Sequence, residues 1–332
     1  MNIFLKHHML KYPLMQTQDK IKLIYQASLG PTHFANQKED INKIYKNILK
    51  EMKVAKKDKP SKFLPYYEMI SESYIRINLL NEFNPKYLAS SFYNSINDST
   101  YDINILKDNL RLYLTPDEYE NYDFSPIHHS KIYSQEYYPH YRIINTKYLT
   151  TIMRIYQLQL FLENTKEHSI IALEGKCASG KSTIAKQFED EYTILHADDF
   201  FLPNNMKTKE RIDEIGGNIN YELIKITLEE IKEAWENSKT KILIKAYSCK
   251  DNSFYEKEIK LKNKIIFEGV YSYHPYFNNL IDKCAFLYVN SETQINRIMK
   301  RNNSTNFINT WMPLENKYYD TFDILSKADI II

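Results

Sequence analysis

The chain has 332 residues, of which 43% are hydrophobic, and its 44 basic and 42 acidic side chains leave a formal net charge of +2. This length suits two domains of roughly 150 residues each, and the apolar content is too high for a disordered chain. The near-neutral charge argues against a nucleic-acid partner or an anionic membrane surface, and no apolar stretch reaches the roughly 18 residues of a membrane span.

The N-terminus and the cysteines suggest a cytoplasmic protein. Lys6 and the two histidines that follow it interrupt the apolar run that a signal peptide would need. The cysteines at 177, 249 and 284 show neither a metal-ligand spacing nor a disulfide framework. We therefore expect a cytoplasmic protein whose partner is a small molecule with a hydroxyl group, with neither nucleic acid nor membrane as a partner. The sequence is also compatible with a homo-oligomer.

Residues 1–124 are predicted to form a mainly α-helical domain of unknown role. Apolar side chains recur at helical spacing, with prolines between the segments, and the predicted helices are Asp19–Leu29, 37–56, 66–80, 85–97 and 102–114. Residues 125–146 fall in a stretch without periodicity that contains two prolines, and we interpret them as a linker.

Residues 147–332 predict an α/β domain. Helices are expected at 147–163, 181–190, 221–237 and 291–301, and strands at 170–175, 193–197, 241–247, 264–269, 285–290 and in the final ADIII. Strands that alternate with helices indicate a parallel sheet with helices on both faces. Ligands of such sheets bind at the carboxyl ends of the strands.

The segment Gly175-Lys-Cys-Ala-Ser-Gly-Lys-Ser182 follows the first predicted strand and opens a helix, as a nucleotide-binding P-loop does. We therefore expect the parallel sheet to be of the P-loop NTPase type. Its glycines let backbone N–H groups surround phosphates. Lys181 is expected to reach the β- and γ-phosphates of ATP, Ser182 to offer its hydroxyl to Mg²⁺, and Thr183 to bond the α-phosphate. The expected nucleotide-binding residues are Gly175, Ala178, Ser179, Gly180, Lys181, Ser182 and Thr183.

Two acidic motifs end later strands of this domain. Asp198 and Asp199 follow the strand 193–197, where a carboxylate could take the proton of a phosphoryl acceptor, and the other interpretation is a helix cap or solvated turn. We expect Asp198 to be the catalytic base and Asp199 to contact substrate. Glu268 closes the strand 264–269 and is expected at the metal with Ser182; an acidic residue without a metal role is the alternative.

Arginines are rare beside lysines in this chain, so an arginine suggests a site that needs a planar bidentate donor. Arg297 and Arg301 lie four residues apart and so on one helix face. With Lys181 and Asp198 they are expected to be catalytic, neutralising phosphate charge, and Arg211 is expected near the substrate. Surface salt bridges are the alternative.

The combination GKCASGKS, DDFF, GGNINYE (216–222), FEGVYS (267–272) and AFLYVN followed by two arginines resembles the phosphoribulokinase/uridine kinase family of P-loop kinases. The resemblance covers about 150–332, and the N-terminal half is similar to the leading segment of some longer bacterial uridine kinase-like proteins. It implies a parallel sheet with a lid, MgATP as donor and a small alcohol as acceptor. It also implies Asp198 as base, Glu268 at the metal, and Arg297 and Arg301 near the lid, for which 302–306 is the expected segment.

Two positions depart from the family pattern. Asn220 stands where nucleoside kinases of the family have the aspartate that holds the ribose hydroxyls, and Tyr247 matches whereas Ser248 and Cys249 after it do not. Asn220 and Tyr247 are still expected to contact substrate. The sequence therefore predicts an ATP-dependent kinase for a small metabolite, with a nucleoside-like acceptor ranked first. The alternatives are another small alcohol, such as a sugar phosphate or a pantothenate-like alcohol, and an ATP-binding or hydrolysing switch whose N-terminal domain binds a partner.

Overall fold

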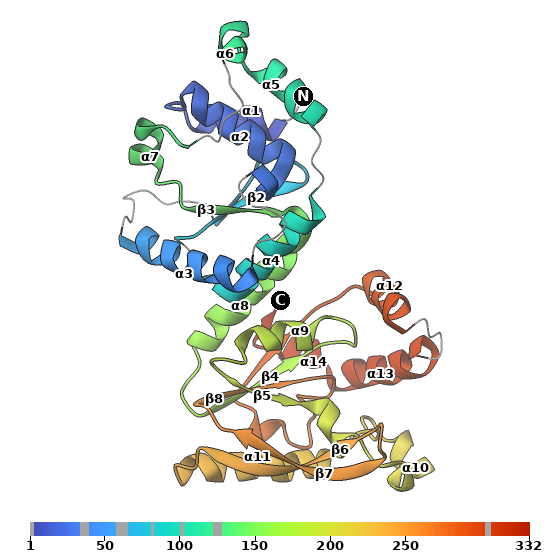
Figure 1. The fold of residues 1–332 in the computed structure, drawn as a ribbon. Coiled ribbons are helices and arrows are strands. Elements are labelled where there is room, and N and C mark those ends of the chain that lie inside the picture. Colours follow the sequence, from blue (N-terminus) through green and yellow to red (C-terminus); the bar gives the residue numbers. More distant parts are fainter. Residues whose placement is uncertain are drawn as a thin grey trace. The chain divides into compact units, whose positions relative to one another are not determined.

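The computed structural model describes residues 3–33, 40–57, 66–80, 83–99, 103–121, 128–302 and 307–332. The chain divides into two compact units, Met1–Tyr156 and Gln157–Ile332 (Figure 1). Among the described residues, no helix has both the length and the apolar character needed to cross a bilayer.

The N-terminal unit surrounds a small antiparallel sheet with helices. The sheet has the order β1-β2-β3, from β1 (Tyr67–Met69), β2 (Tyr74–Asn78) and β3 (Tyr141–Asn145). The helices are α1 (Ile3–Lys11), α2 (Thr17–Leu29), α3 (Ile41–Lys57), α4 (Pro85–Asp98), α5 (Ile103–Tyr113), α6 (Pro116–Glu120), α7 (Lys131–Tyr137) and the first part of α8 (Leu149–Glu163). The expectation of a mainly helical N-terminal region holds.

Strand β2 has apolar contacts on both faces of the sheet. Successive side chains along a strand point to opposite faces, so neighbouring residues belong to different clusters. Ile75 and Ile77 are buried in a cluster with α3 and α4, whereas Tyr74 belongs to a second cluster with α2 and α5. Arg76 lies between the two isoleucines and is also buried. The central strand therefore carries a charged side chain in the interior of this unit.

Two sequence predictions differ from this unit. The helix predicted at 66–80 is wrong, because this segment forms β1 and β2, whose aromatic and β-branched side chains pack on a sheet. The expected linker also contains structure, since α7 lies within 125–146 and β3 pairs along its whole length with β2. Sheet pairing partners lie far apart in sequence, so local periodicity alone did not reveal β3.

The C-terminal unit contains a five-stranded parallel sheet in the order β10-β9-β4-β8-β5. The strands are β4 (Ser169–Glu174), β5 (Thr193–His196), β8 (Lys264–Glu268), β9 (Lys283–Phe286) and β10 (Ile330–Ile331). Helices cover it, among them α9 (Lys181–Ala185), α11 (Tyr221–Glu236), α12 (Ser291–Asn302), α13 (Met312–Phe322) and α14 (Ile324–Lys327), with the short α10 (Lys209–Asp213) before α11. The predicted α/β class with a P-loop NTPase-type sheet is confirmed.

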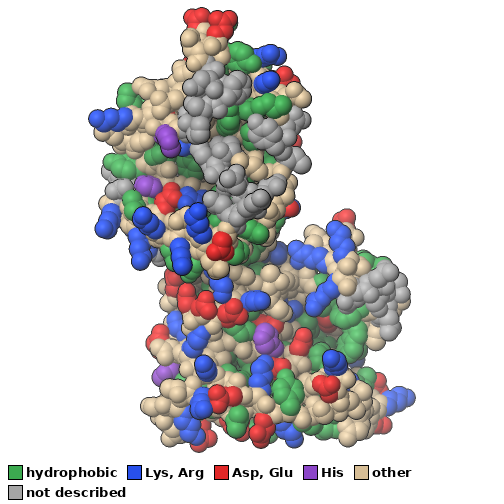
Figure 2. Space-filling model, in the orientation of Figure 1, with side chains coloured by type: hydrophobic (Ala, Val, Ile, Leu, Met, Phe, Trp, Pro, Cys, Tyr) green, Lys and Arg blue, Asp and Glu red, His purple; other side chains and the backbone are tan. Residues whose placement is uncertain are grey.

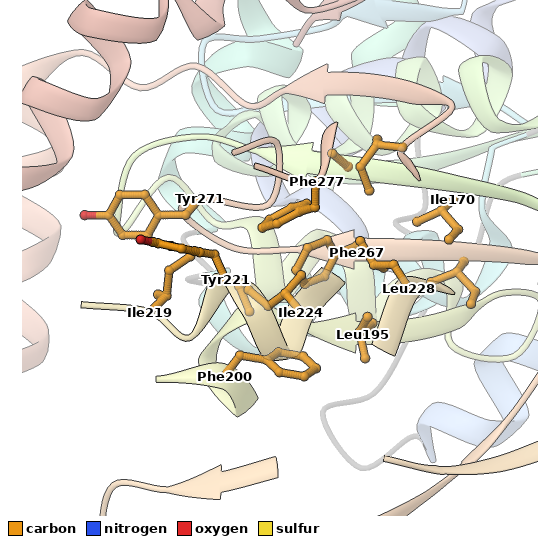
Figure 3. Close-up of a cluster of buried hydrophobic side chains, with 14 of the residues drawn as sticks. Ile170, Leu195, Phe200, Ile219, Tyr221, Ile224, Leu228, Phe267, Tyr271 and Phe277 are labelled. Atoms are coloured by element: carbon orange, nitrogen blue, oxygen red, sulfur yellow. The ribbon is translucent and has the colours of Figure 1, made fainter. Parts of the chain in front are cut away.

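Apolar packing fixes the position of the strands. Alternate side chains of β4 and β8, such as Ala172 and Phe267, join α11 in one buried cluster, where Phe267 meets Phe200 and Phe277 edge-on or tilted (Figure 3). The other side chains of β4 are equally buried. In Figure 1, α9 and α11 lie on opposite sides of the sheet. Since both faces are covered, the site can form only at the ends of the strands.

The strand predicted at 241–247 exists, but it lies outside the parallel sheet. It is β6 (Lys241–Ser248), which forms an antiparallel hairpin with β7 (Ser253–Lys260). Its lysines and Leu243 face solvent, whereas all of β4 is buried. A strand with one polar face suits a hairpin, because central strands of a doubly covered sheet are apolar throughout.

Candidate active site

The P-loop is a tight turn between β4 and α9. Gly175 has φ +145° and Gly180 has φ +106°, both in the region that favours glycine. A Cβ added at Gly175 would lie 2.5 Å from the backbone oxygen of Leu287, whereas one at Gly180 would meet nothing within 4 Å. Gly175 is therefore required both for its conformation and for the close approach of the loop to the end of β9.

Replacing Gly175 by alanine is expected to destabilise the protein more than Gly180→Ala does. Both variants strain the backbone by about 1–3 kcal/mol, but only the first also forces a side chain into backbone, which adds roughly 1–3 kcal/mol. Urea unfolding curves of the two variants, followed by circular dichroism, would measure the difference. Equal losses of unfolding free energy would show that the contact with Leu287 does not constrain the loop.

Lys181 and Ser182 open α9 beside a cavity of about 540 Å³, which they line together with Ala178. Lys181 is buried, and its ammonium donates to the carbonyl oxygens of Gly175 (2.5 Å) and Lys176 (3.0 Å). The buried Ser179 hydroxyl has no hydrogen-bond partner among the described residues. Thr183 is exposed and does not line the cavity, so its contact with an α-phosphate stays a prediction.

Asp198 and Glu268 converge on the same cavity from neighbouring strands. His196 and Glu268 are register partners at the ends of β5 and β8, and His196 Nδ1 lies 2.7 Å from Glu268 Oε1. This hydrogen bond raises the pKa of His196. Burial of the carboxyl group, followed by the negative charge of Glu268, raises the pKa of Asp198. The raised pKa makes Asp198 a better proton acceptor than an ordinary aspartate.

Oxygen atoms suited to Mg²⁺ are present at this cavity, in the Ser182 hydroxyl and the Glu268 carboxylate. Of the two Glu268 carboxylate oxygens, Oε1 is hydrogen-bonded to His196. Within the described ranges, no three His, Cys, Asp or Glu side chains come together as a metal site. The two residues fit a magnesium ion whose remaining ligands are phosphate oxygens and water, which is the usual arrangement for Mg²⁺.

Asp199, Arg211 and Asn220 do not line the cavity, in contrast to their expected contact with substrate. Asp199 forms an ion pair with Lys257 of β7, at 2.7 Å. Asn220 caps α11, accepting a hydrogen bond from the Leu223 N–H. Both side chains thus have partners within the protein, and their contact with substrate stays a prediction.

Arg211 holds the loop before α11 together. Its guanidinium donates two 2.7 Å hydrogen bonds to the Glu222 carboxylate, bonds the carbonyl oxygens of Gly217 and Ile219, and lies 3.6 Å from the centre of the Tyr221 ring. With a further 3.5 Å contact to Glu214, these bonds occupy every N–H of the side chain. In this structure Arg211 therefore positions the loop, and its expected contact with substrate stays a prediction.

The two arginines of α12 have different places. Arg301 lines the cavity, as does Tyr247, whose hydroxyl is hydrogen-bonded to Asn252. Arg297 instead donates to the carbonyl oxygens of Ala178 and Ser179, at 3.0 Å each. It therefore braces the P-loop from outside the cavity. The expected lid segment at 302–306 lies, apart from the backbone of Asn302, outside the described residues.

Two buried carboxylates at the P-loop were not predicted from the sequence. Glu315 of α13 lines the cavity and accepts the Cys177 N–H at 2.9 Å, and burial raises its pKa. Glu174, the last residue of β4, accepts the Gly175 N–H at 3.0 Å and the hydroxyls of two tyrosines of α13. The two tyrosines follow Glu315 at i+3 and i+4, and this spacing on one helix face was the available signal.

Part of the cavity wall is aromatic. Phe201, Phe307 and Trp311 all line it, with Trp311 6.3 Å from each of the two phenylalanine rings. Asn218 and Tyr271 contribute polar groups, and the buried Tyr271 hydroxyl makes no hydrogen bond within the described part of the chain. A mostly apolar wall with a few polar groups is typical of small-molecule sites.

No family model and no curated protein matches this chain. Among solved structures, it is similar to a possible uridine kinase from Bacillus stearothermophilus, with 16% identity, a TM-score of 0.43, and coverage of 55% of this chain and 99% of the other. It is also similar to TT1252 from Thermus thermophilus, with 13% identity, a TM-score of 0.30, and coverage of 50% and 88%. Likeness at this level assigns no activity, and the α/β class follows from the strand order described above.

Proposed function

We propose that the C-terminal unit is an ATP-dependent kinase that transfers the γ-phosphoryl group to a hydroxyl of a small metabolite. The observation that carries this proposal is one cavity lined by Lys181 and Ser182 of the P-loop and by Asp198 and Glu268 from neighbouring strands. Phosphate-binding groups alone would suit any nucleotide-binding protein. A carboxylate with a raised pKa in the same cavity is what transfer to a hydroxyl additionally needs.

Each residue has a defined part in the transfer. The Lys181 ammonium and the loop N–H groups bind the phosphates, and Arg301 adds positive charge at the rim of the cavity. The acceptor oxygen forms a bond to the γ-phosphorus while the bond to the ADP oxygen breaks, and Asp198 takes the acceptor proton. Ser182 and Glu268 would hold Mg²⁺, which supplies neutralisation of phosphate charge.

The acceptor that we rank first is nucleoside-like. Phe201, Phe307 and Trp311 offer flat apolar surface for a ring, while Asn218 and Tyr271 offer hydrogen bonds. A sugar phosphate or a pantothenate-like alcohol is the next candidate, since Lys207 and Arg301 also line the cavity. An ATP-hydrolysing switch, with the N-terminal unit binding a partner, would need no acceptor-activating base.

The direct experiment measures ADP formation by the full chain with MgATP, with and without a panel of nucleosides and small alcohols. We expect at least one acceptor to stimulate ADP formation and to appear as a phosphorylated product by mass spectrometry. ATP hydrolysis that no acceptor stimulates, and that yields only inorganic phosphate, would contradict the kinase and support the switch.

The pH dependence of the reaction tests the base separately. A base works only when deprotonated, so turnover must fall as the pH drops through the pKa of Asp198. Burial and then the charge of Glu268 raise this pKa above the usual 3.8, and the opposing effects of Lys181 and His196 do not cancel them. This is the pKa of the protein without Mg²⁺, so it is measured from kcat/KM for MgATP, which reports the free enzyme. We therefore expect kcat/KM to be lost at a higher pH than an ordinary aspartate would give. An acid limb with its midpoint at or below 3.8, in protein still folded by circular dichroism, would contradict this assignment.

A further inference from the structure

The N-terminal unit contains a buried arginine without an acidic partner. Arg76 of β2 is only 3% exposed. Its guanidinium donates to Gln26 Oε1 (2.6 and 3.0 Å), His8 Nε2 (2.6 Å) and the Tyr133 hydroxyl (3.3 Å), and it lies 4.4 Å from the centre of the Tyr141 ring. All these contacts are with uncharged groups. Within the described residues, no carboxylate forms an ion pair with Arg76.

A buried positive charge is costly unless an anion balances it. The carboxylate whose charge acts on Arg76 is that of Glu68, and it is already bound by the Lys11 ammonium at 2.5 Å and the Tyr12 hydroxyl at 2.6 Å. The charge of Arg76 is felt by its neighbours, since burial and then Arg76 lower the pKa of Lys22 to about 8 and that of His8 well below its usual value. The other buried carboxylate of this unit, Asp19, is bound by Ser130 and His129. The guanidinium of Arg76 therefore has acidic groups in its surroundings but none among its direct contacts.

A cavity of about 400 Å³ lies next to this arginine. Gln26 and Tyr141, which contact Arg76, are also part of the cavity wall, and Lys22 and Arg142 line it as well. The one acidic side chain among the described lining residues, Glu51, forms an ion pair with Arg142. The volume is in the range of small-molecule sites, roughly 300–1,000 Å³.

The protein surface around the cavity is rich in lysine side chains. Helix α3, which contributes part of the wall, carries six lysines, all exposed, and Glu51 as its one acidic residue. In Figure 2, Lys and Arg side chains gather over the part of the N-terminal unit where α3 lies. Such a surface attracts anions toward the cavity. Ile44, Phe92 and Ile143 make another part of the wall apolar.

We propose that this cavity binds a small organic anion, with its carboxylate or phosphate group beside Lys22 and Gln26 and its apolar part against Phe92. An oxyanion there would balance the charge of Arg76 through Gln26, which hydrogen-bonds the guanidinium. Lys22 would donate to it directly, and charge-assisted hydrogen bonds of this type are the stronger ones. All lining residues of this cavity belong to the N-terminal unit, so the proposed anion site can be tested independently of the proposed kinase activity.

Binding is tested with three probes: inorganic phosphate, benzoate and phenyl phosphate, with phenol as the neutral counterpart. Because the P-loop also binds phosphate, calorimetry uses the full chain with Lys181→Ala. We expect saturable binding of phenyl phosphate and none of phenol. Absence of saturable binding for all three anions, or equal binding of phenol, would overturn the proposal.

Lys22 provides a local readout that a second phosphate site would not move. Its lowered pKa makes it reactive toward an acylating reagent at pH 8, and peptide mass spectrometry reports the modification of each lysine. Phenyl phosphate at about ten times its Kd is expected to slow modification of Lys22 about tenfold. Lys20 lies on the same helix as Lys22 and pairs with Glu118 of α6, and it is expected to be modified at an unchanged rate. Equal rates for Lys22 with and without the probe would place any binding elsewhere and overturn the proposal.

Substitutions complete the test. Lys22→Gln is expected to weaken phenyl phosphate binding by about tenfold or more, because a hydrogen bond to a charged group is lost. Lys22→Arg keeps the charge and is expected to retain most of the affinity, and Lys20→Gln is the matched control on α2. Equal affinity of Lys22→Gln and Lys20→Gln would contradict the assigned role of Lys22.

Discussion

Replacing Asp198 by asparagine is expected to lower kcat by about 10²–10⁴-fold, the usual contribution of a general base. Asparagine has nearly the same shape but cannot accept the proton of the acceptor hydroxyl. Lys181 and Ser182, which bind the nucleotide in this proposal, are untouched, so the KM for ATP should change little. Steady-state kinetics with the acceptor that stimulates ADP formation would measure both constants.

The adjacent carboxylate provides the control for this variant. Asp199 is paired with Lys257 and does not line the cavity. Asp199→Asn is expected to change kcat by no more than about fivefold, since a partly exposed ion pair contributes about 0–1 kcal/mol. If Asp198→Asn retains acceptor-dependent turnover close to that of the unaltered protein, Asp198 is not the base.

The parts of the site that the sequence predicted are those set by local geometry. A strand, a glycine turn and a helix follow one another from Ser169 to Ala185, so their order could be predicted without any distant contact. Asp198 and Glu268 come from different strands, but the carboxyl ends of parallel strands meet at one edge of the sheet. The prediction of a parallel sheet was therefore enough to predict that these two carboxylates lie close together.

The expected substrate residues that lie outside the cavity have partners that residue type does not reveal. Arg211 was expected near the substrate because guanidinium groups bind oxyanions, but Glu222 provides a carboxylate of matching geometry eleven residues later. Asn220 stands directly before a predicted helix, so its role as N-cap was readable from the sequence. The resemblance to nucleoside kinases favoured the substrate interpretation over this local one.

The positions of Glu315 and Arg76 could not be read from the sequence for a different reason. Glu315 reaches the Cys177 N–H across 138 positions of the chain, and nothing in its own neighbourhood indicates the P-loop. Arg76 lies in a segment predicted as a helix, so the sequence did not place it on a sheet. Only the pairing of β2 with β3 places it in the interior. Long-range pairing, which local patterns do not encode, accounts for both.

Lys181→Ala is the second variant with a large expected effect. The ammonium is the buried cation at the P-loop end of the cavity, and the other lysine of the loop, Lys176, does not line the cavity. Removing a preorganised donor to transferring charge costs about 10²–10³-fold in kcat, and nucleotide binding should weaken as well. Turnover kinetics and calorimetry with a non-hydrolysable ATP analogue would separate the two effects.

The same lysine also has a structural contact, which the experiment must separate from its chemical role. Its hydrogen bonds to the carbonyl oxygens of Gly175 and Lys176 close the loop, so some loss of stability is expected. A loss of about 1–3 kcal/mol, as for a hydrogen bond to a charged group, would leave the protein folded. Lys186→Ala, at an exposed position in the turn after α9, is the matched control and should change neither binding nor turnover. If Lys181→Ala binds the ATP analogue as tightly as Lys186→Ala does, the loop at 175–182 is not the nucleotide site, and the proposed kinase fails with it.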